Sequence, residues 1–114
     1  APAVCLVLRV NSGYIIARMR YGIVFSPEAI DDLGVLKANI RAAIMDGIEE
    51  HLRHEPTKIS KSRIKRLRGL SRPQYRLRME EVRVFYDVTE KTVEVLAIVP
   101  KDEAEQWLEK AGEP

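Results

Sequence analysis

The chain has 114 residues, 46% of them apolar, and a formal net charge of +2. This length suits one domain with a modest core, and the apolar content argues against a chain that is disordered throughout. No apolar run is long enough to cross a bilayer and the start makes a poor signal peptide, so we expect no membrane association and a cytoplasmic protein.

The first elements in chain order are an apolar start, a short strand and a helix. The segment Val4–Val10 either adds an edge strand or mediates self-association. Tyr21–Phe25 is rich in β-forming residues and predicts a strand. Ser26 is a good N-cap and Pro27 fits the first helical position, so a helix is expected to begin here and to break near 34–37.

A second helix is predicted over about Ala38–His54, and Pro56 would stop it. Apolar residues recur at every fourth position, which gives the helix one apolar side. We expect this stripe to pack in the core, and a partner-binding face around Leu36 and Ile40 is the alternative. The stripe comprises Ile40, Ile44, Ile48 and Leu52.

The connection after this helix is strongly basic. The 31 residues 53–83 hold eleven Lys or Arg and three acidic residues, whereas the rest of the chain is net acidic. Such a cluster repels itself unless an anion neutralises it, and nucleic acid is the first candidate because cations release counterions on meeting phosphates. A solvated charged surface is the alternative.

The segment Tyr75–Val88 alternates apolar and polar residues, which predicts two strands joined at Glu80-Glu81. In this register Tyr75 opposes Tyr86, and an apolar face forms on one side. The same register sets Arg78 opposite Arg83, which is unfavourable. A further strand, Thr92–Val99, continues the sheet, and we expect its alternate residues to join the apolar face, namely Val93, Val95, Ala97 and Val99.

The chain ends in a predicted short helix, Asp102–Lys110, which Trp107 and Leu108 would anchor. The last four residues, 111–114, are expected to fray. His51 and His54 lack a third ligand, so we predict surface histidines rather than a metal site. The lone Cys5 cannot form an internal disulfide, which fits a reducing compartment.

Three arginines, Arg76, Arg78 and Arg83, are predicted to project from one face of the hairpin. Arginine is well suited to bidentate phosphate contact. Phe85 shares this face, where it either stacks on a base or packs under the C-terminal helix. Pairing of Arg76 or Arg78 with an acidic neighbour would neutralise part of the cluster; the candidates are Glu80, Glu81, Asp87 and Glu94.

The order of the predicted elements (two helices, a basic connection and strands) and the motifs of the chain resemble those of the RelE/ParE superfamily of type II toxins. The motifs are the basic-Leu-Arg-Gly turn at 66–69, Tyr-basic-Leu-basic at Tyr75–Arg78 and Arg-x-x-Tyr at Arg83–Tyr86. The resemblance covers residues 19–114, to about Leu108, and leaves residues 1–18 as an N-terminal extension. It implies an α+β fold in which a small antiparallel sheet packs on an N-terminal helical pair, with a short C-terminal helix.

The resemblance implies a toxin encoded beside a cognate antitoxin. RelE-type members cleave mRNA on the ribosome without metal or cofactor, by attack of the ribose 2′-hydroxyl on the adjacent phosphate. By position, the implied catalytic residues are Arg76, Arg78, Arg83 and Lys101. The implied RNA-binding residues, together with Phe85, are Lys61, Lys65, Arg66, Arg68 and Arg72.

The chain also departs from the RelE pattern. Arg76 and Arg78 stand where RelE has lysines, and arginine stays charged, so electrostatic stabilisation is expected rather than general-base catalysis. Trp107 takes the approximate place of a stacking tyrosine, although a core anchor is the preferred interpretation. Two alternatives to the ribonuclease therefore remain: a ParE-like gyrase inhibitor that performs no chemistry, and an inactive homologue that only binds its antitoxin.

Overall fold

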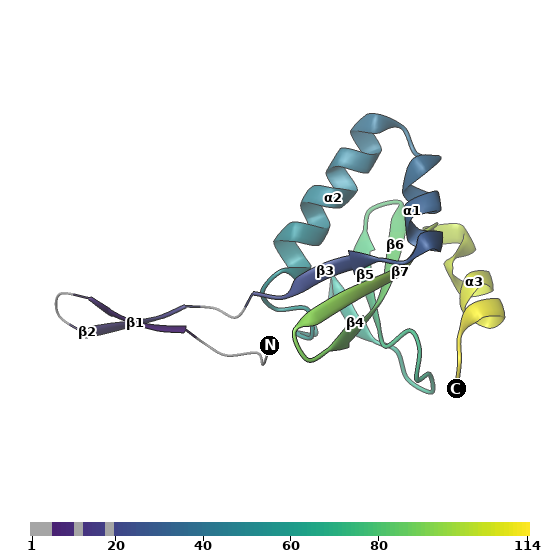
Figure 1. The fold of residues 1–114 in the computed structure, drawn as a ribbon. Helices are drawn as coiled ribbons and strands as arrows, with labels where there is room; N and C mark the ends of the chain where they lie inside the picture. The colour runs from purple at the N-terminus through teal and green to yellow at the C-terminus, as the bar shows by residue number, and fades with distance from the viewer. Residues whose placement is uncertain (1–5, 11–12, 18–19) are drawn as a thin grey trace.

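The computed structural model describes residues 6–10, 13–17 and 20–114, with side chains from residue 20 onward. Its order is strand, strand, strand, helix, helix, four strands and a C-terminal helix (Figure 1). The elements are β1 (Leu6–Val10), β2 (Gly13–Ala17), β3 (Gly22–Phe25), α1 (Pro27–Gly34), α2 (Ala38–Leu52), β4 (Ile64–Arg66), β5 (Tyr75–Met79), β6 (Val82–Thr89), β7 (Thr92–Pro100), η1 (Lys101–Glu103) and α3 (Ala104–Ala111).

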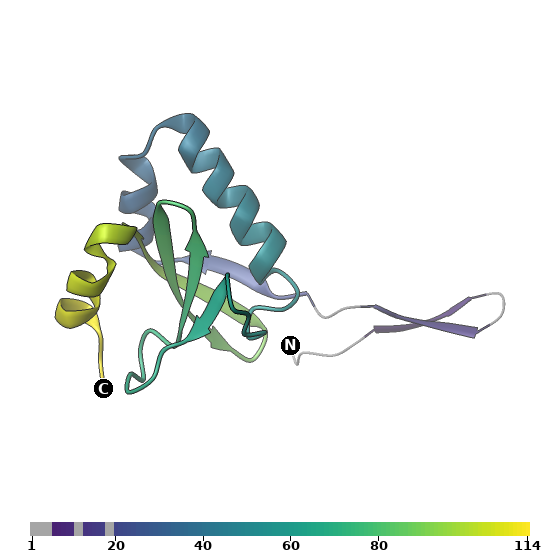
Figure 2. The same cartoon turned by 180° about the vertical axis from the view of Figure 1, so that it is seen from behind.

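The N-terminal strands β1 and β2 pair antiparallel and form a two-stranded sheet of their own. Figures 1 and 2 show this hairpin lying apart from the central sheet. The prediction that Val4–Val10 adds an edge strand to that sheet is therefore wrong for the part that is described, because β1 pairs with β2 instead. Val4 and Cys5 lie outside the described residues.

The central sheet has five strands in the order β3-β7-β6-β5-β4. The predicted α+β class is confirmed, and all neighbouring pairs are antiparallel except β3 and β7, which run parallel. Strand β4 was not predicted, because its residues Ile64–Arg66 lie within the basic connection and show no long alternation. Its pairing with β5 brings the basic connection onto the sheet edge.

Helix α1 begins as the sequence predicts and is fastened to β7. The Ser26 hydroxyl accepts a hydrogen bond from the Ala29 N–H (3.1 Å) and donates one to the Leu96 carbonyl (2.8 Å). The Asp32 carboxylate accepts a hydrogen bond from the Ile98 N–H (2.9 Å). These contacts satisfy free groups at the helix start and fix α1 against the sheet.

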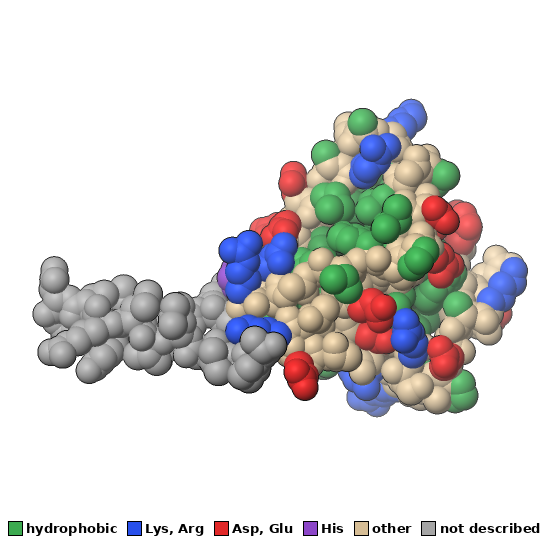
Figure 3. Space-filling model, viewed as in Figure 1, with side chains coloured by type: hydrophobic (Ala, Val, Ile, Leu, Met, Phe, Trp, Pro, Cys, Tyr) green, Lys and Arg blue, Asp and Glu red, His purple; other side chains and the backbone are tan. Residues whose placement is uncertain are grey.

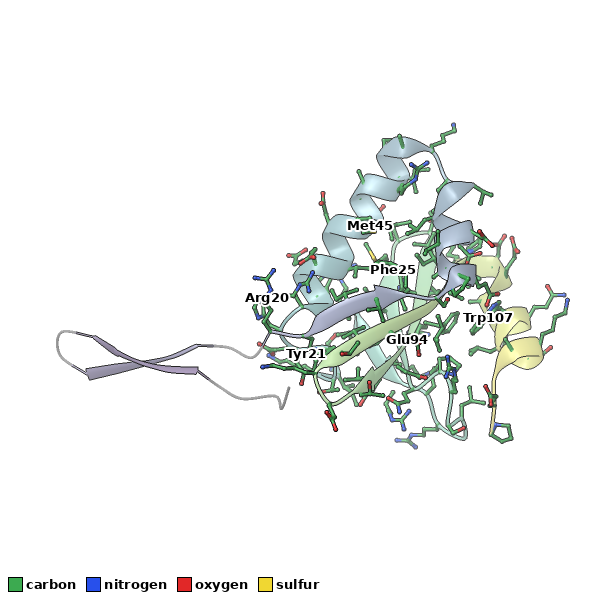
Figure 4. The ribbon with its side chains drawn as sticks, viewed as in Figure 1. Arg20, Tyr21, Phe25, Met45, Glu94 and Trp107 are labelled. Atoms are coloured by element: carbon green, nitrogen blue, oxygen red, sulfur yellow. The ribbon has the colours of Figure 1, made fainter. Side chains whose placement is uncertain are left out.

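Helix α2 packs most of its predicted stripe into the core. Ile44, Ile48 and Leu52 are buried, but Ile40 is 40% exposed, so its place in the core was predicted wrongly. Figure 3 shows apolar side chains gathered on the surface over α2, β3 and α1, and Figure 4 places Met45 and Phe25 there. No helix in the described part of the chain is long and apolar enough to cross a membrane.

The β5–β6 hairpin has the predicted register, in which Tyr75 opposes Tyr86 and Leu77 opposes Val84. Glu80 adopts a left-handed conformation (φ 46°), which lets the Glu80-Glu81 turn close tightly. The apolar face of the hairpin packs on α2 in the main core, where the buried Tyr86 hydroxyl donates a hydrogen bond to the Pro56 carbonyl (2.6 Å).

Strand β7 contains an irregularity that the sequence did not predict. Phe85 pairs with Ala97 but the next residue, Tyr86, pairs with Val95, which leaves Leu96 as an extra residue. A one-residue insertion exchanges the two faces of a strand. Ala97 and Val99 therefore lie in the second cluster with Phe85, and Ile98 takes their predicted place in the main core.

The C-terminal segment is fixed to the domain, contrary to the prediction that it frays. The predicted helix is a 3-10 turn, η1, followed by α3. After α3, the Ser71 N–H donates to the Glu113 carbonyl (2.7 Å) and the Glu113 N–H to the Arg72 carbonyl (2.8 Å). This short antiparallel bridge holds α3 against the second face of the sheet.

Candidate nucleic-acid interface

Strands β5 and β6 bring three arginines together on the sheet face opposite α1 and α2. Arg78 pairs directly with Arg83, and Arg76 pairs with Phe85. Residues paired across a ladder share a face, and residues two apart on one strand do as well. The residues between them, Leu77 and Val84, are completely buried in the main core, which fixes the direction of the arginines.

Arg76 is the most enclosed of the three arginines. Its Nε atom is buried and has no hydrogen-bond partner. Burial lowers the pKa of Arg76, and the positive charges of Arg83 and Arg78 lower it further. A buried donor without a partner costs free energy, and so do neighbouring like charges, so an anion bound here would relieve both costs.

Arg83 and Arg78 differ in how they are held. The Arg83 Nη1 atom donates to the carbonyl oxygens of Glu80 and Val82, both at 2.9 Å, which positions the guanidinium over the turn. The Arg78 side chain is exposed. Its backbone carbonyl accepts a hydrogen bond from Arg63 Nη1 (3.2 Å), so a further guanidinium, one that the sequence interpretation missed, lies beside the cluster.

Lys101 lies at the same end of the sheet as Arg83. Its backbone N–H donates to the Glu81 carbonyl (2.8 Å), and its Nζ atom lies 3.4 Å from Glu81 Oε1. The register places Val82 opposite Pro100, next to this lysine. Lys101 is therefore an exposed ammonium group beside the Glu80-Glu81 turn, and the Glu81 carboxylate is its ionic partner.

The acidic residues of this face form ion pairs with Arg72 and not with the three arginines of the cluster. Arg72 Nε lies 3.7 Å from Asp87 Oδ2, and Arg72 Nη2 lies 3.3 Å from Glu94 Oε1. Asp87 is only 7% exposed and also accepts a hydrogen bond from the Gln74 N–H (2.7 Å). The predicted ion pair of Arg76 or Arg78 with one of the four acidic neighbours is not found among the described residues, and Arg72 has a structural role at the opposite end of the face.

Phe85 is completely buried, so the structure does not support it as a stacking residue for a base. Its ring stacks on that of Trp107, with centroids 4.8 Å apart and an interplanar angle of 9°. The indole Nε1 donates to Glu28 Oε1 (3.2 Å), and Figure 4 labels Trp107 on α3. Two predictions are confirmed here: Phe85 packs under the C-terminal helix, and Trp107 anchors that helix.

The remaining predicted RNA-binding residues surround the cluster. Lys65 pairs with Arg76, so it shares the arginine face, whereas Arg66 pairs with Tyr75 on the other face. Lys61 and Arg68 are exposed in the segments that flank β4. Positive charge therefore extends from the cluster around the β4 edge of the sheet.

The described residues contain no group of three or more His, Cys, Asp or Glu side chains that could hold a metal ion. The arginines of β5 and β6 and Lys101 offer guanidinium and ammonium groups on this face. Such groups bind phosphates and stabilise negative charge that develops on a phosphorus centre. The arginine cluster (Arg76, Arg78 and Arg83) lies on one sheet face, with Lys101 directly after the end of β7 nearest Arg83, and cations in this arrangement are suited to a phosphodiester.

Comparisons with known proteins show the family and the fold of the chain. Residues 23–105 match the family described as the ParE toxin of the type II toxin–antitoxin system parDE. No curated relative matches the chain. Among solved structures, the toxin–antitoxin complex RelBE2 from Mycobacterium tuberculosis matches with a TM-score of 0.62 and 25% identity, over 72% of this chain and 92% of that chain.

Two further solved structures show the same fold. The archaeal RelE–RelB complex from Pyrococcus horikoshii matches with a TM-score of 0.60 and 23% identity, over 73% of this chain and 97% of that one. An arginine double mutant of E. coli RelE in the free state matches with a TM-score of 0.60 and 22% identity, over 78% and 92%. The chain belongs to the ParE toxin family, within the RelE/ParE superfamily of type II toxins.

Proposed function

We propose that this toxin is a ribosome-dependent endoribonuclease that cleaves mRNA on its arginine face. The observation that carries the proposal is the arginine cluster without an acidic partner: Asp87 and Glu94 pair with Arg72, and Arg76 Nε has no partner. Opposed like charges destabilise a sheet, so a function in anion binding accounts for their presence.

In the proposed reaction, the ribose 2′-hydroxyl loses its proton to solvent water as its oxygen attacks the adjacent phosphorus, and the bond from phosphorus to the 5′-oxygen breaks. The departing 5′-oxygen takes a proton from the donor group, which solvent water then reprotonates. The products are a cyclic phosphate and a free 5′-hydroxyl. Arg76, Arg78 and Arg83 stabilise the negative charge that builds up on the phosphoryl oxygens. We assign them no proton transfer, because a guanidinium holds its proton at all physiological pH values.

Lys101 is the proposed proton donor to the departing 5′-oxygen. The Lys101 ammonium group is exposed and carries N–H donors, and Glu81 Oε1 lies 3.4 Å from its Nζ atom. Lys101 and Arg83 both bond to the Glu80-Glu81 turn, Lys101 through its backbone N–H and Arg83 through its guanidinium, and this position supports the role. The proposed setting is the bacterial or archaeal cytoplasm, where ribosome and mRNA are available.

The proposed partner is a cognate antitoxin. The matching structures from M. tuberculosis and P. horikoshii are complexes with RelB-type antitoxins. We expect an antitoxin segment with acidic side chains either to cover the arginine cluster or to displace α3, since each would block access to the cationic face.

The test is primer extension on translated messages after induction of the toxin in cells. The wild type should produce cuts at defined codon positions, and Arg83→Ala should abolish them. Arg41→Ala, which removes an arginine from α2 on the other side of the sheet, is the matched control and should retain the cuts.

The family match to ParE favours a second candidate, a protein that inhibits DNA gyrase without chemistry of its own. A DNA-damage response without message cleavage would support that candidate and reject the ribonuclease. Absence of both effects, with antitoxin binding intact, would identify an inactive homologue.

A further inference from the structure

A three-layer stack runs from the core to the surface at the β4 edge of the sheet. The rings of Tyr86 and Tyr75 stack with centroids 5.5 Å apart and an interplanar angle of 16°. The guanidinium carbon of Arg66 lies over the Tyr75 ring, 5.2 Å from its centroid. Register places the three residues in one row across β6, β5 and β4, with Tyr75 in the middle.

Exposure increases along this row. Tyr86 is completely buried, Tyr75 is partly buried and Arg66 is exposed. The stack therefore ends at the surface on the guanidinium of Arg66. A guanidinium is planar and stacks readily on aromatic rings, and nucleobases offer such a ring surface.

The orientation of this guanidinium is fixed by more than the ring. Arg66 Nη1 donates hydrogen bonds to the carbonyl oxygens of Gln74 (2.7 Å) and Leu67 (3.4 Å). A side chain held in this way loses less conformational entropy when a ligand binds. Arg68, two residues further on, is also exposed but makes no such contact with any described residue, so it provides an internal comparison.

Arg66 also lies next to the proposed RNA site. Its neighbour on β4, Lys65, pairs with Arg76 on the arginine face. A single strand that crosses the β4 edge would contact Lys65 and Arg76 with its phosphates and reach Arg66 with a base. The buried Phe85 cannot supply this stacking contact.

We propose that Arg66, oriented by Tyr75, stacks on an unpaired nucleobase of the single-stranded RNA that occupies the arginine cluster. Arg66 then recognises a base, whereas its charge alone would indicate only a phosphate contact. The inference rests on the proposed function, since it requires RNA at this face.

The test measures, by fluorescence anisotropy at low ionic strength, how tightly the purified toxin binds a short single-stranded RNA. The intact RNA is compared with a series of RNAs of the same sequence, each of which lacks the base at one position. For the wild type, one abasic position should weaken binding about fivefold, toward the low end of the range for stacking of one base.

Arg66→Lys keeps the charge and removes the planar group, so it should bind the intact and abasic RNAs equally. Arg68→Lys is the matched control and should retain the wild-type difference. As a second readout, 2-aminopurine at the sensitive position should be quenched on binding to the wild type and to Arg68→Lys, but not on binding to Arg66→Lys.

The outcomes separate this inference from the proposed function. If the wild type binds intact and abasic RNAs equally, or if Arg66→Lys keeps the difference, the stacking role is rejected and the ribonuclease proposal stands. If the wild type binds no RNA, the inference is also rejected. The primer-extension result with Arg83→Ala then decides the proposed function on independent grounds.

Discussion

The two faces of the central sheet are built from the same strands but differ in how their side chains are satisfied. On the face toward α1 and α2, Leu77, Val84 and Tyr86 are completely buried in one continuous core. On the other face, the outward residues of β6 are Arg83, Phe85 and Asp87, and each has a different environment. Arg83 lies in an open cationic cluster, Phe85 is covered by Trp107, and Asp87 is neutralised by Arg72.

This difference indicates which part of the molecule serves stability and which serves binding. The core face and the covered middle of the second face follow the usual rule that apolar groups are buried and polar groups are paired. The arginine cluster breaks that rule, because like charges are opposed and a buried Nε atom has no partner. Side chains that depart from this rule at a cost in stability are expected at functional sites.

The largest expected loss of stability follows from a substitution on the face toward α1 and α2. Leu77→Ala should lower the free energy of unfolding by about 2–5 kcal/mol, because the completely buried side chain leaves a cavity. Urea unfolding followed by circular dichroism measures this loss. A loss below about 1 kcal/mol would show that this face is less tightly packed than its burial indicates.

A substitution in the middle of the second face, where Trp107 covers Phe85, should lower stability by a smaller amount. Trp107→Ala should lower the free energy of unfolding by about 2 kcal/mol, because Trp107 is only partly buried but covers Phe85. The same urea titration measures it, with the exposed neighbour Gln106→Ala as the control. Equal stability of the two variants would contradict a role for Trp107 in holding α3.

A substitution in the arginine cluster should instead increase the stability of the protein. Arg78→Gln should raise the free energy of unfolding by about 0.5 kcal/mol, because it removes a charge directly opposite Arg83. The gain should shrink at high salt and be accompanied by weaker RNA binding. Lys37→Gln, which removes an exposed positive charge elsewhere, is the control. A loss of stability in Arg78→Gln would show that the like charges are already compensated.

The smallest expected effect concerns Asp87, at the other end of the second face, and it is a dependence of stability on pH. Burial raises the pKa of Asp87 above its ordinary value of 3.8, although the Gln74 N–H and Arg72 oppose the shift. The folded state therefore favours the protonated carboxyl. The cost of ionising it is absent below pH 3.8 and grows as pH rises through the elevated pKa.

Wild-type stability relative to Asp87→Asn should accordingly fall as pH rises through this window. Thermal unfolding of both proteins across a pH series measures the difference. Parallel curves for the two proteins would show that hydrogen bonding and the attraction of Arg72 cancel the effect of burial.

Local patterns in the sequence determined much of the fold. Ser26 and Pro27 specify the start of α1, and the spacing of Ile44, Ile48 and Leu52 specifies the buried side of α2. Strict alternation fixed the register of β5 and β6, and with it the shared face of the three arginines. These features depend on neighbours that are close in sequence, so a single chain reveals them.

Only the tertiary structure decided which of these side chains remain free. The extra residue Leu96 accommodates the start of α1 and exchanges the faces of Ala97 and Ile98. Arg72 reaches Asp87 and Glu94 across the sheet, which leaves the arginine cluster without acids. Trp107 covers Phe85, and Arg66 ends a stack on Tyr75. Each outcome depends on contact between distant segments, and alternation along one strand carries no information about such contacts.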